Sequence, residues 1–186
     1  MQNVIIRKNR IYLTGFMGSG KSTLAPIIAN VLGYEHVDID KAIEGKTGLT
    51  ISDIFKTHGE AYFRSIERAI LVELSLKPNV VVALGGGTVA FNDNLSIMKS
   101  SGLLVYLKAD PEIIIRRVKR KENRPLLKDE DGTMLTEEAL RTRIHTLLTT
   151  REQFYLKADI IIEVGNANIP LTVDRIVNKI RKHVDV

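Results

Sequence analysis

The 186-residue chain carries a net charge of +5 at pH 7, with 44% apolar residues, 26% charged residues and no cysteine. This composition is typical of a soluble globular protein, and the lack of cysteine excludes disulfides and thiolate metal sites. No apolar run approaches the ~20 residues of a membrane span, and residues 1–10 lack the pattern of a signal peptide, so we expect a cytoplasmic protein without a membrane partner.

Basic residues outnumber acidic ones, but their pattern does not indicate nucleic-acid binding. Aromatic residues, which stack on bases in single-strand binding proteins, make up only 5% of the chain. The densest basic run, residues 116–124, has the composition of a solvated helix face. We therefore expect no nucleic-acid partner, and a small anionic substrate accounts for the excess of positive charge.

The first predicted element is a short strand, Arg10 to Thr14, which leads into a glycine-rich loop. Residues 15–22, GFMGSGKS, match the pattern G-x-x-x-x-G-K-[ST], and a predicted helix from Ser22 to Leu32 follows. Backbone N–H groups and the helix N-terminus of such a loop hold nucleotide phosphates, while the lysine reaches the β- and γ-phosphates and the serine offers an oxygen to Mg²⁺. The predicted nucleotide contacts are Gly15, Gly18, Ser19, Gly20, Lys21, Ser22 and Thr23.

Two aspartates, Asp38 and Asp40, stand at the end of the second predicted strand, Glu35 to Asp38. If the strand continues through them, their spacing puts both carboxylates on one side, at the edge where parallel sheets bind ligands. One aspartate would then hold Mg²⁺, and the other would orient or deprotonate an acceptor hydroxyl. The alternative is a pair of turn or helix N-cap aspartates, because Asp is common at both positions.

Alternation of short apolar runs with helical patterns predicts a parallel sheet wrapped by helices. The three further strands are Val80 to Leu84, Leu103 to Leu107 and Asp159 to Glu163. The first two of these lack polar alternation, as strands buried on both faces do. The predicted helices cover residues 22–32, 50–57, 60–76, 92–100, 111–121, 136–156 and 169–182.

Two further segments bear on ligand binding. Gly85, Gly86 and Gly87 follow the third strand and permit close approach of the backbone to a ligand, although a plain turn has the same composition. Residues 119–135 predict a long loop of the kind that forms a mobile lid. Without an internal repeat or a linker, the chain is expected to form one domain, residues 1–186, with a three-layer α/β fold and a five-stranded parallel sheet.

These motifs in combination resemble those of the shikimate kinases, small relatives of the nucleoside monophosphate kinases. The resemblance covers most of the chain. It implies a P-loop kinase that uses Mg²⁺ and transfers the γ-phosphoryl group of ATP to the 3-hydroxyl of shikimate, in the pathway to chorismate and aromatic amino acids. The motifs that carry it are the phosphate loop, Asp38-Ile39-Asp40, the run from Gly48 to Phe55, Phe63-Arg64-x-x-Glu67, the glycine triplet, Arg124-Pro125-Leu126-Leu127 and Arg151-x-x-x-Tyr155.

The same resemblance implies roles for matching positions. Asp40 would be the base or orienting carboxylate, with Lys21 and the lid residue Arg124 acting on the transferred phosphate. Ser22 and Asp38 would hold Mg²⁺. Adenine would lie against Arg117, with Asn168 in the C-terminal loop near it. The acceptor would bind to a helical region at about residues 39–68 and to the glycine triplet, through Asp40, Phe55, Phe63, Arg64, Glu67, Gly85, Gly86, Gly87 and Arg151.

Two other functions remain open at this point. A gluconate-type kinase shares the phosphate loop and a similar acceptor, but the glycine triplet and the Phe63-Arg64-x-x-Glu67 pattern resemble the shikimate enzymes more closely. A nucleotide-sensing module without catalysis would not need the acceptor residues. We expect a monomer, as is usual for a small kinase with a moving lid.

Overall fold

The computed structural model describes residues 9–119, 133–165 and 168–183. Its strands are β1 (Arg10–Thr14), β2 (Glu35–Asp38), β3 (Val80–Ala83), β4 (Leu103–Ala109) and β5 (Ile160–Val164). Its helices are α1 (Lys21–Leu32), α2 (Ile39–Thr47), α3 (Ile51–Leu76), α4 (Asn94–Ser101), α5 (Pro111–Lys119), α6 (Glu137–Tyr155) and α7 (Ile169–Arg181), with a short 3-10 helix η1 (Thr88–Ala90).

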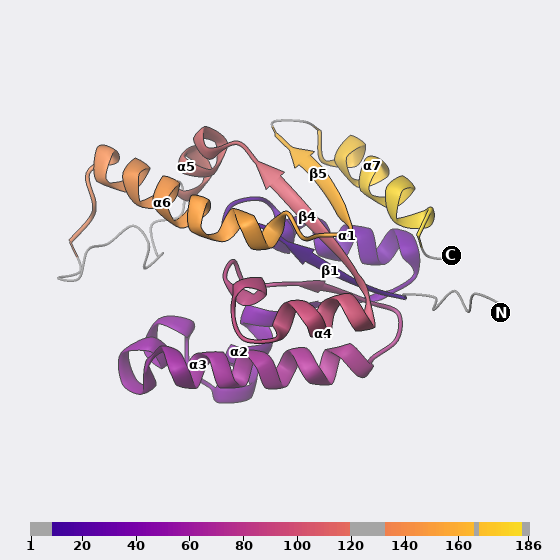
Figure 1. Ribbon diagram of the computed structural model, residues 1–186, viewed down its shortest axis with the longest axis horizontal. Coiled ribbons are helices and arrows are strands. Elements are labelled where there is room, and N and C mark those ends of the chain that lie inside the picture. Colours follow the sequence, from indigo (N-terminus) through magenta and orange to yellow (C-terminus); the bar gives the residue numbers. More distant parts are fainter. Residues whose placement is uncertain (1–8, 120–132, 166–167, 184–186) are drawn as a thin grey trace.

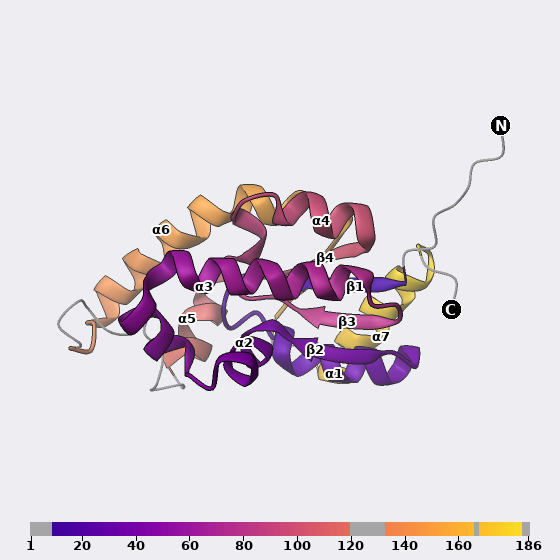
Figure 2. The same ribbon diagram turned by 90° about the horizontal axis from the view of Figure 1, so that it is seen from below.

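The strands form one parallel sheet in the order β2-β3-β1-β4-β5 (Figure 1). α1 and α7 pack together on one face of this sheet, and α3 and α4 pack together on the other (Figure 2). The predicted α/β fold with five parallel strands is therefore confirmed. Among the described residues, the structure contains no helix that is both long and apolar enough to cross a membrane.

The central strands are buried on both faces, as their apolar runs predict. Every residue of β3 is buried, and so is every residue of β1 after Arg10. In the sheet register, Leu13 of β1 pairs with Ala83 of β3 and with Val105 of β4. The carboxyl ends of these strands therefore meet at one edge, which brings the segments that follow β1 and β3 close together.

Two helical elements lie outside the helices predicted from apolar periodicity, although the resemblance implied a helical region over about residues 39–68. α2 has only Ile39 and Ile43 buried among polar residues, which is too weak an apolar period to indicate a helix from sequence. η1 is a single turn after the glycine triplet. The expected helix over residues 92–100 begins instead at Asn94, because Asn92 has a left-handed φ of 49°.

The predicted break between helices 50–57 and 60–76 is present as a kink inside α3. Gly59 takes φ 78° and ψ 175°, a non-helical conformation within the run Ile51–Leu76. Glycine adopts such angles without the steric cost that a Cβ brings. The predicted lid, residues 119–135, lies mostly outside the described residues, and so does Arg124.

Candidate active site

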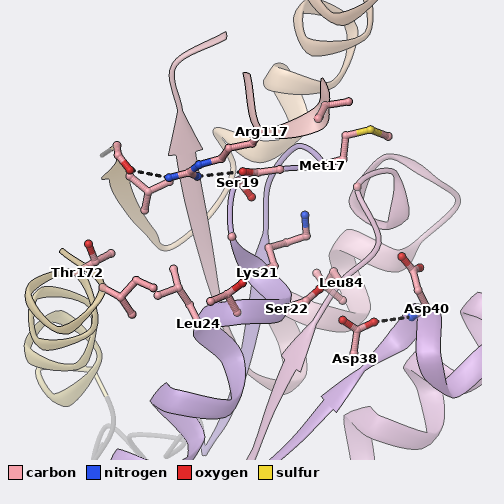
Figure 3. Close-up of a pocket in the computed structure, with 18 residues that line it drawn as sticks. Met17, Ser19, Lys21, Ser22, Leu24, Asp38, Asp40, Leu84, Arg117 and Thr172 are labelled. Carbon is pink, nitrogen blue, oxygen red and sulfur yellow. Dashed lines mark hydrogen bonds between the residues drawn. The ribbon is translucent and has the colours of Figure 1, made fainter. Parts of the chain in front are cut away.

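A cavity of about 460 Å³ opens at the carboxyl edge of the sheet. Figure 3 shows Asp38 and Asp40 at one side of it and Thr172 of α7 at the other, with Lys21 and Ser22 at the start of α1 between them. The lining also includes Leu84 and Gly86, which follow β3. The cavity therefore joins the phosphate-loop motif, the aspartate pair and the glycine triplet, as the topology of a parallel sheet requires.

The phosphate loop winds tightly because its glycines take conformations that other residues avoid. Gly15 has φ 138°, and a Cβ built on it would lie 2.6 Å from the carbonyl oxygen of Leu107. Gly20 has φ 103° and is the N-cap of α1. The loop can therefore keep this path only with glycine at these positions, and it ends at the electropositive end of a helix.

Lys21 is 8% exposed, and its ammonium group lies against the loop itself. Nζ donates to the carbonyl oxygens of Gly15 at 2.7 Å and Phe16 at 3.1 Å. Ser22 and Thr23 are exposed and line the cavity. Ser19 also lines it, but its side chain is buried and its N–H donates to the Phe16 carbonyl.

β2 ends at Asp38, as predicted, so the condition that would put Asp38 and Asp40 on one side of a strand is not met. Asp38 is the last residue of the strand and the N-cap of α2, where its carboxylate accepts hydrogen bonds from the N–H groups of Asp40 at 3.1 Å and Lys41 at 3.3 Å. Asp40 lies in the first turn of that helix. The N-cap alternative therefore holds for Asp38, while both aspartates still line the cavity.

Acidic side chains converge on Gly85, directly after Leu84. A Cβ built on Gly85 would lie 3.0 Å from Glu67 Oε1, 3.0 Å from Thr88 Oγ1 and 3.1 Å from Asp40 Oδ1. Those three atoms come from α3, η1 and α2. Because Gly85 has no side chain, polar groups from all three elements can lie close to its Cα. Thr88 was not predicted, because a threonine after a turn gives no functional signal in sequence.

Basic side chains approach the other two glycines. A Cβ on Gly87 would lie 3.1 Å from Arg64 Nη2, and one on Gly86 would lie 3.7 Å from Arg151 Nη1 and 3.5 Å from the backbone nitrogen of Met17 in the phosphate loop. The triplet is thus bracketed by two guanidinium groups from α3 and α6. Planar guanidinium groups suit a carboxylate ligand.

Arg64 is held by an acidic and aromatic environment. Its Nη1 donates to Glu67 Oε2 at 2.8 Å, and the Glu67 side chain is 1% exposed. The Thr88 hydroxyl donates to the other Glu67 oxygen at 2.5 Å. The Arg64 guanidinium also lies 3.7 Å from the centroid of the Phe91 ring, a cation–π contact that the sequence did not indicate.

The two predicted wall residues, Phe55 and Phe63, pack against each other in α3. Their ring centroids are 4.8 Å apart, and Phe63 is buried whereas Phe55 is 39% exposed. Arg64 also contacts the Phe63 ring at 5.0 Å. Phe63 therefore packs against the Arg64 guanidinium, and Phe55 leaves an apolar surface exposed to solvent.

Arg117 of α5 spans the far end of the cavity. Its Nη1 donates to the Gly18 carbonyl at 3.0 Å and its Nη2 to the Gly165 carbonyl at 2.7 Å. Burial, and then the nearby charge of Arg116, lower the pKa of Arg117. This side chain therefore ties the phosphate loop to the segment after β5.

Asn168 is exposed at the N-cap of α7 and is not part of the cavity lining, which instead includes Ile169 and Thr172 of that helix. Within the described part of the chain, no three His, Asp or Glu side chains gather into a metal site. Ser22 and Asp38, the two expected metal ligands, both line the cavity.

Comparison with known proteins adds independent findings. A family model described as shikimate kinase matches residues 17–184. The chain is 44% identical over 174 residues to the shikimate kinase of Chlorobaculum tepidum, an alignment that covers 94% of this chain and 91% of the relative. The shikimate kinase of Prosthecochloris aestuarii is 43% identical over the same share of this chain and 88% of its own length.

Two solved structures are similar throughout. The shikimate kinase of Bacteroides thetaiotaomicron superposes with a TM-score of 0.85 at 33% identity, covering 92% of this chain and 98% of the other. The shikimate kinase of Acinetobacter baumannii, solved in complex with shikimate, has the same TM-score at 34% identity and covers 96% and 95%.

Proposed function

This chain belongs to the shikimate kinase family, and we propose that it transfers the γ-phosphoryl group of ATP to the 3-hydroxyl of shikimate, giving shikimate 3-phosphate and ADP. The observation that carries the proposal is the convergence of Asp40, Glu67, Arg64 and Arg151 on the glycine triplet, beside the phosphate loop. The product lies on the route to chorismate and aromatic amino acids. The enzyme acts as a monomer of one domain in the cytoplasm.

The phosphates of ATP bind at the loop, where N–H groups and the N-terminus of α1 provide positive potential. Lys21 has a long side chain whose ammonium group already lies at the loop. Moving from the carbonyl oxygens of Gly15 and Phe16 to phosphate oxygens exchanges neutral acceptors for charged ones, which form stronger bonds. Lys21 then stabilises the charge that redistributes during transfer.

Ser22 and Asp38 would hold Mg²⁺. Both present oxygen atoms in the cavity next to the phosphate loop, and Mg²⁺ prefers one or two such protein ligands together with phosphates and water. When bound, the ion offsets the negative charge of the phosphates. The N-cap bonds of Asp38 fix the direction of its carboxylate independently of the metal.

The acceptor binds at the edge of the cavity that Asp40 and Gly86 line. Arg64 and Arg151 hold the carboxylate of shikimate, and Glu67 keeps Arg64 in place through the buried ion pair. Asp40, in the exposed first turn of α2, accepts a hydrogen bond from the 3-hydroxyl and takes its proton as the new bond to phosphorus forms. Arg124, outside the described residues, would reach the transferred phosphate as the lid closes.

The test is a coupled ADP-release assay with ATP and Mg²⁺ on shikimate, quinate, gluconate and AMP. We expect shikimate to exceed the others by at least ~10²-fold in kcat/KM, because buried charged groups penalise an acceptor that leaves them unpaired. Equal turnover of gluconate would instead favour the gluconate-type kinase. Lack of turnover with any acceptor, despite ATP binding, would favour a nucleotide-sensing module.

A matched pair of arginine variants checks the acceptor site. Arg64→Ala should raise the KM for shikimate far more than the KM for ATP. Arg68→Ala removes an arginine one turn further along α3, whose partner is the exposed Asp93 at 2.8 Å, and should leave both constants unchanged. An unaltered shikimate KM in Arg64→Ala would refute the assignment of Arg64 to the acceptor site.

A further inference from the structure

Tyr155, the last residue of α6, places a buried hydroxyl against the glycine triplet. The side chain is fully buried, and its hydroxyl donates a hydrogen bond to the carbonyl oxygen of Gly86. Its ring stacks on that of Tyr106 in β4, with centroids 5.0 Å apart. Core packing therefore fixes the orientation of the Tyr155 ring and, with it, the position of the hydroxyl.

The glycine that Tyr155 contacts lies between the cavity, the phosphate loop and α6. Gly86 lines the cavity, and a Cβ on it would lie 3.5 Å from the Met17 nitrogen of the phosphate loop and 3.7 Å from Arg151 Nη1. Arg151 is one helical turn before Tyr155 on α6. A single hydrogen bond thus joins the turn after β3 to the helix that carries one of the two guanidinium groups.

The Tyr155–Gly86 hydrogen bond also fixes the orientation of a peptide plane in the turn. The turn's own hydrogen bonds hold the peptides on either side of the Gly86–Gly87 peptide: Thr88 donates to the Gly85 carbonyl, and the N–H of Ala90 donates to the Gly87 carbonyl. Three glycines in succession leave the middle peptide many accessible conformations. The peptide between Gly86 and Gly87 is trans, and a trans peptide points its C=O and N–H in opposite directions. Holding the carbonyl toward Tyr155 therefore directs the N–H of Gly87 away from it.

The donor stays protonated across the physiological range. Burial raises the pKa of Tyr155 to about 12, although the positive charge of Arg151 acts in the opposite direction. The hydroxyl is thus a permanent donor to Gly86 rather than a group that ionises during turnover.

We propose that Tyr155 is a positioning residue of the acceptor site, which fixes the Gly86–Gly87 peptide and the spacing between the glycine turn and Arg151. The inference rests on the proposed function for its kinetic consequence, but its structural part does not. Tyr155 does not line the cavity that holds the phosphate loop, so its effect should fall on the acceptor and not on ATP.

The experiment compares three tyrosine-to-phenylalanine variants. Tyr155→Phe removes the hydroxyl that bonds to Gly86 and lies beside Arg151. Tyr106→Phe removes the hydroxyl of its stacking partner. Tyr12→Phe removes another buried tyrosine hydroxyl, bonded to Ser101 at 2.8 Å between β1 and the end of α4. We measure the KM for shikimate and for ATP, the melting temperature, and amide hydrogen exchange of residues 85–87 in the protein without substrates.

Tyr155→Phe should raise the shikimate KM about threefold to tenfold, as loss of one buried hydrogen bond does, with the ATP KM within twofold of the parent. Exchange at residues 85–87 should be faster in that variant alone. Tyr12→Phe and Tyr106→Phe should keep the parent shikimate KM even where the melting temperature falls.

Two results would overturn the inference: unchanged exchange and an unchanged shikimate KM in Tyr155→Phe, or the same KM increase in Tyr12→Phe, which would mean a general loss of stability. Failure of the proposed function is a separate result. If the parent does not phosphorylate shikimate, the kinase assignment fails, and the exchange measurement still decides whether Tyr155 holds the turn.

Discussion

Replacing Gly85 with alanine would place a methyl group among three polar atoms of the acceptor site. The new Cβ would lie 3.0 Å from Glu67 Oε1, 3.0 Å from Thr88 Oγ1 and 3.1 Å from Asp40 Oδ1. Ordinary van der Waals contact at such positions begins at 3.4 Å. Each neighbour must therefore retreat by a few tenths of an ångström, or the turn must move.

The side chain with the most room to move is the most exposed one. Glu67 is buried and bonded to Arg64 at 2.8 Å and to Thr88 at 2.5 Å, so its carboxylate resists displacement. Asp40 is exposed in the first turn of α2. The displacement should therefore fall mainly on the carboxylate that we assign as the base.

The magnitude follows from the size of the shift. Misplacement of a catalytic group by about 1 Å commonly costs ~10²-fold in rate, so a few tenths of an ångström should lower kcat by about tenfold. Overpacking costs roughly 1–3 kcal/mol, and lower chain entropy in the unfolded state offsets about 0.4–1 kcal/mol of it. The melting temperature should fall by roughly 2–6 °C.

The assay is steady-state turnover of shikimate with a melting curve for each variant, and Gly45→Ala is the matched control. Gly45 lies in α2, and nothing lies within 4 Å of a Cβ built there. That variant should gain about 0.5–1 kcal/mol of stability at unchanged kcat. If Gly85→Ala keeps kcat within twofold of the parent, the convergence of carboxylates on Gly85 is not the catalytic geometry.

Three further predictions concern the nucleotide side and alkaline stability. Lys21→Ala should lower kcat by ~10²-fold or more with shikimate KM nearly unchanged; turnover within a factor of two of the parent would exclude its role. Asp38→Asn keeps the helix cap, since Asn caps as well as Asp, but should raise the Mg²⁺ concentration for half-maximal rate. Asp40→Asn should leave only a residual turnover, whose metal dependence and ATP affinity match those of the parent. Identical metal titrations of the two variants would contradict this division. The pKa of Tyr155 is raised from 10.0 to about 12 in the folded protein, so the stability that its hydroxyl contributes is complete below pH 10 and is lost as the pH rises from 10 to 12. Denaturant unfolding at pH 9 and 11 should show a loss that is about 1.4 kcal/mol larger in the parent than in Tyr155→Phe, because Tyr106 and Tyr12, whose pKa values are also raised, contribute equally to both proteins.

The sequence by itself determined the sheet and the nucleotide end of the cavity. The bounds of β1 follow from an apolar run. The phosphate loop follows from its residue spacing, together with the strand before it and the helix after it. The break at Gly59 was also predictable. These features are local: residues within a few positions of one another set the backbone angles, so the pattern contains the information.

Tertiary structure alone decided how the acceptor groups meet. Asp40 lies near Gly85 because Asp38 caps α2 and places Asp40 in the first turn of that helix. The apolar period of α2 is too weak to predict this helix from sequence. The Thr88 hydroxyl meets Glu67 across 21 positions, and the Tyr155 hydroxyl meets the Gly86 carbonyl across 69. Which hydroxyl meets which acceptor depends on how α3 and α6 pack against the sheet. A side chain's type fixes what it can bond to, but only packing of the whole chain fixes which partner lies within 3 Å.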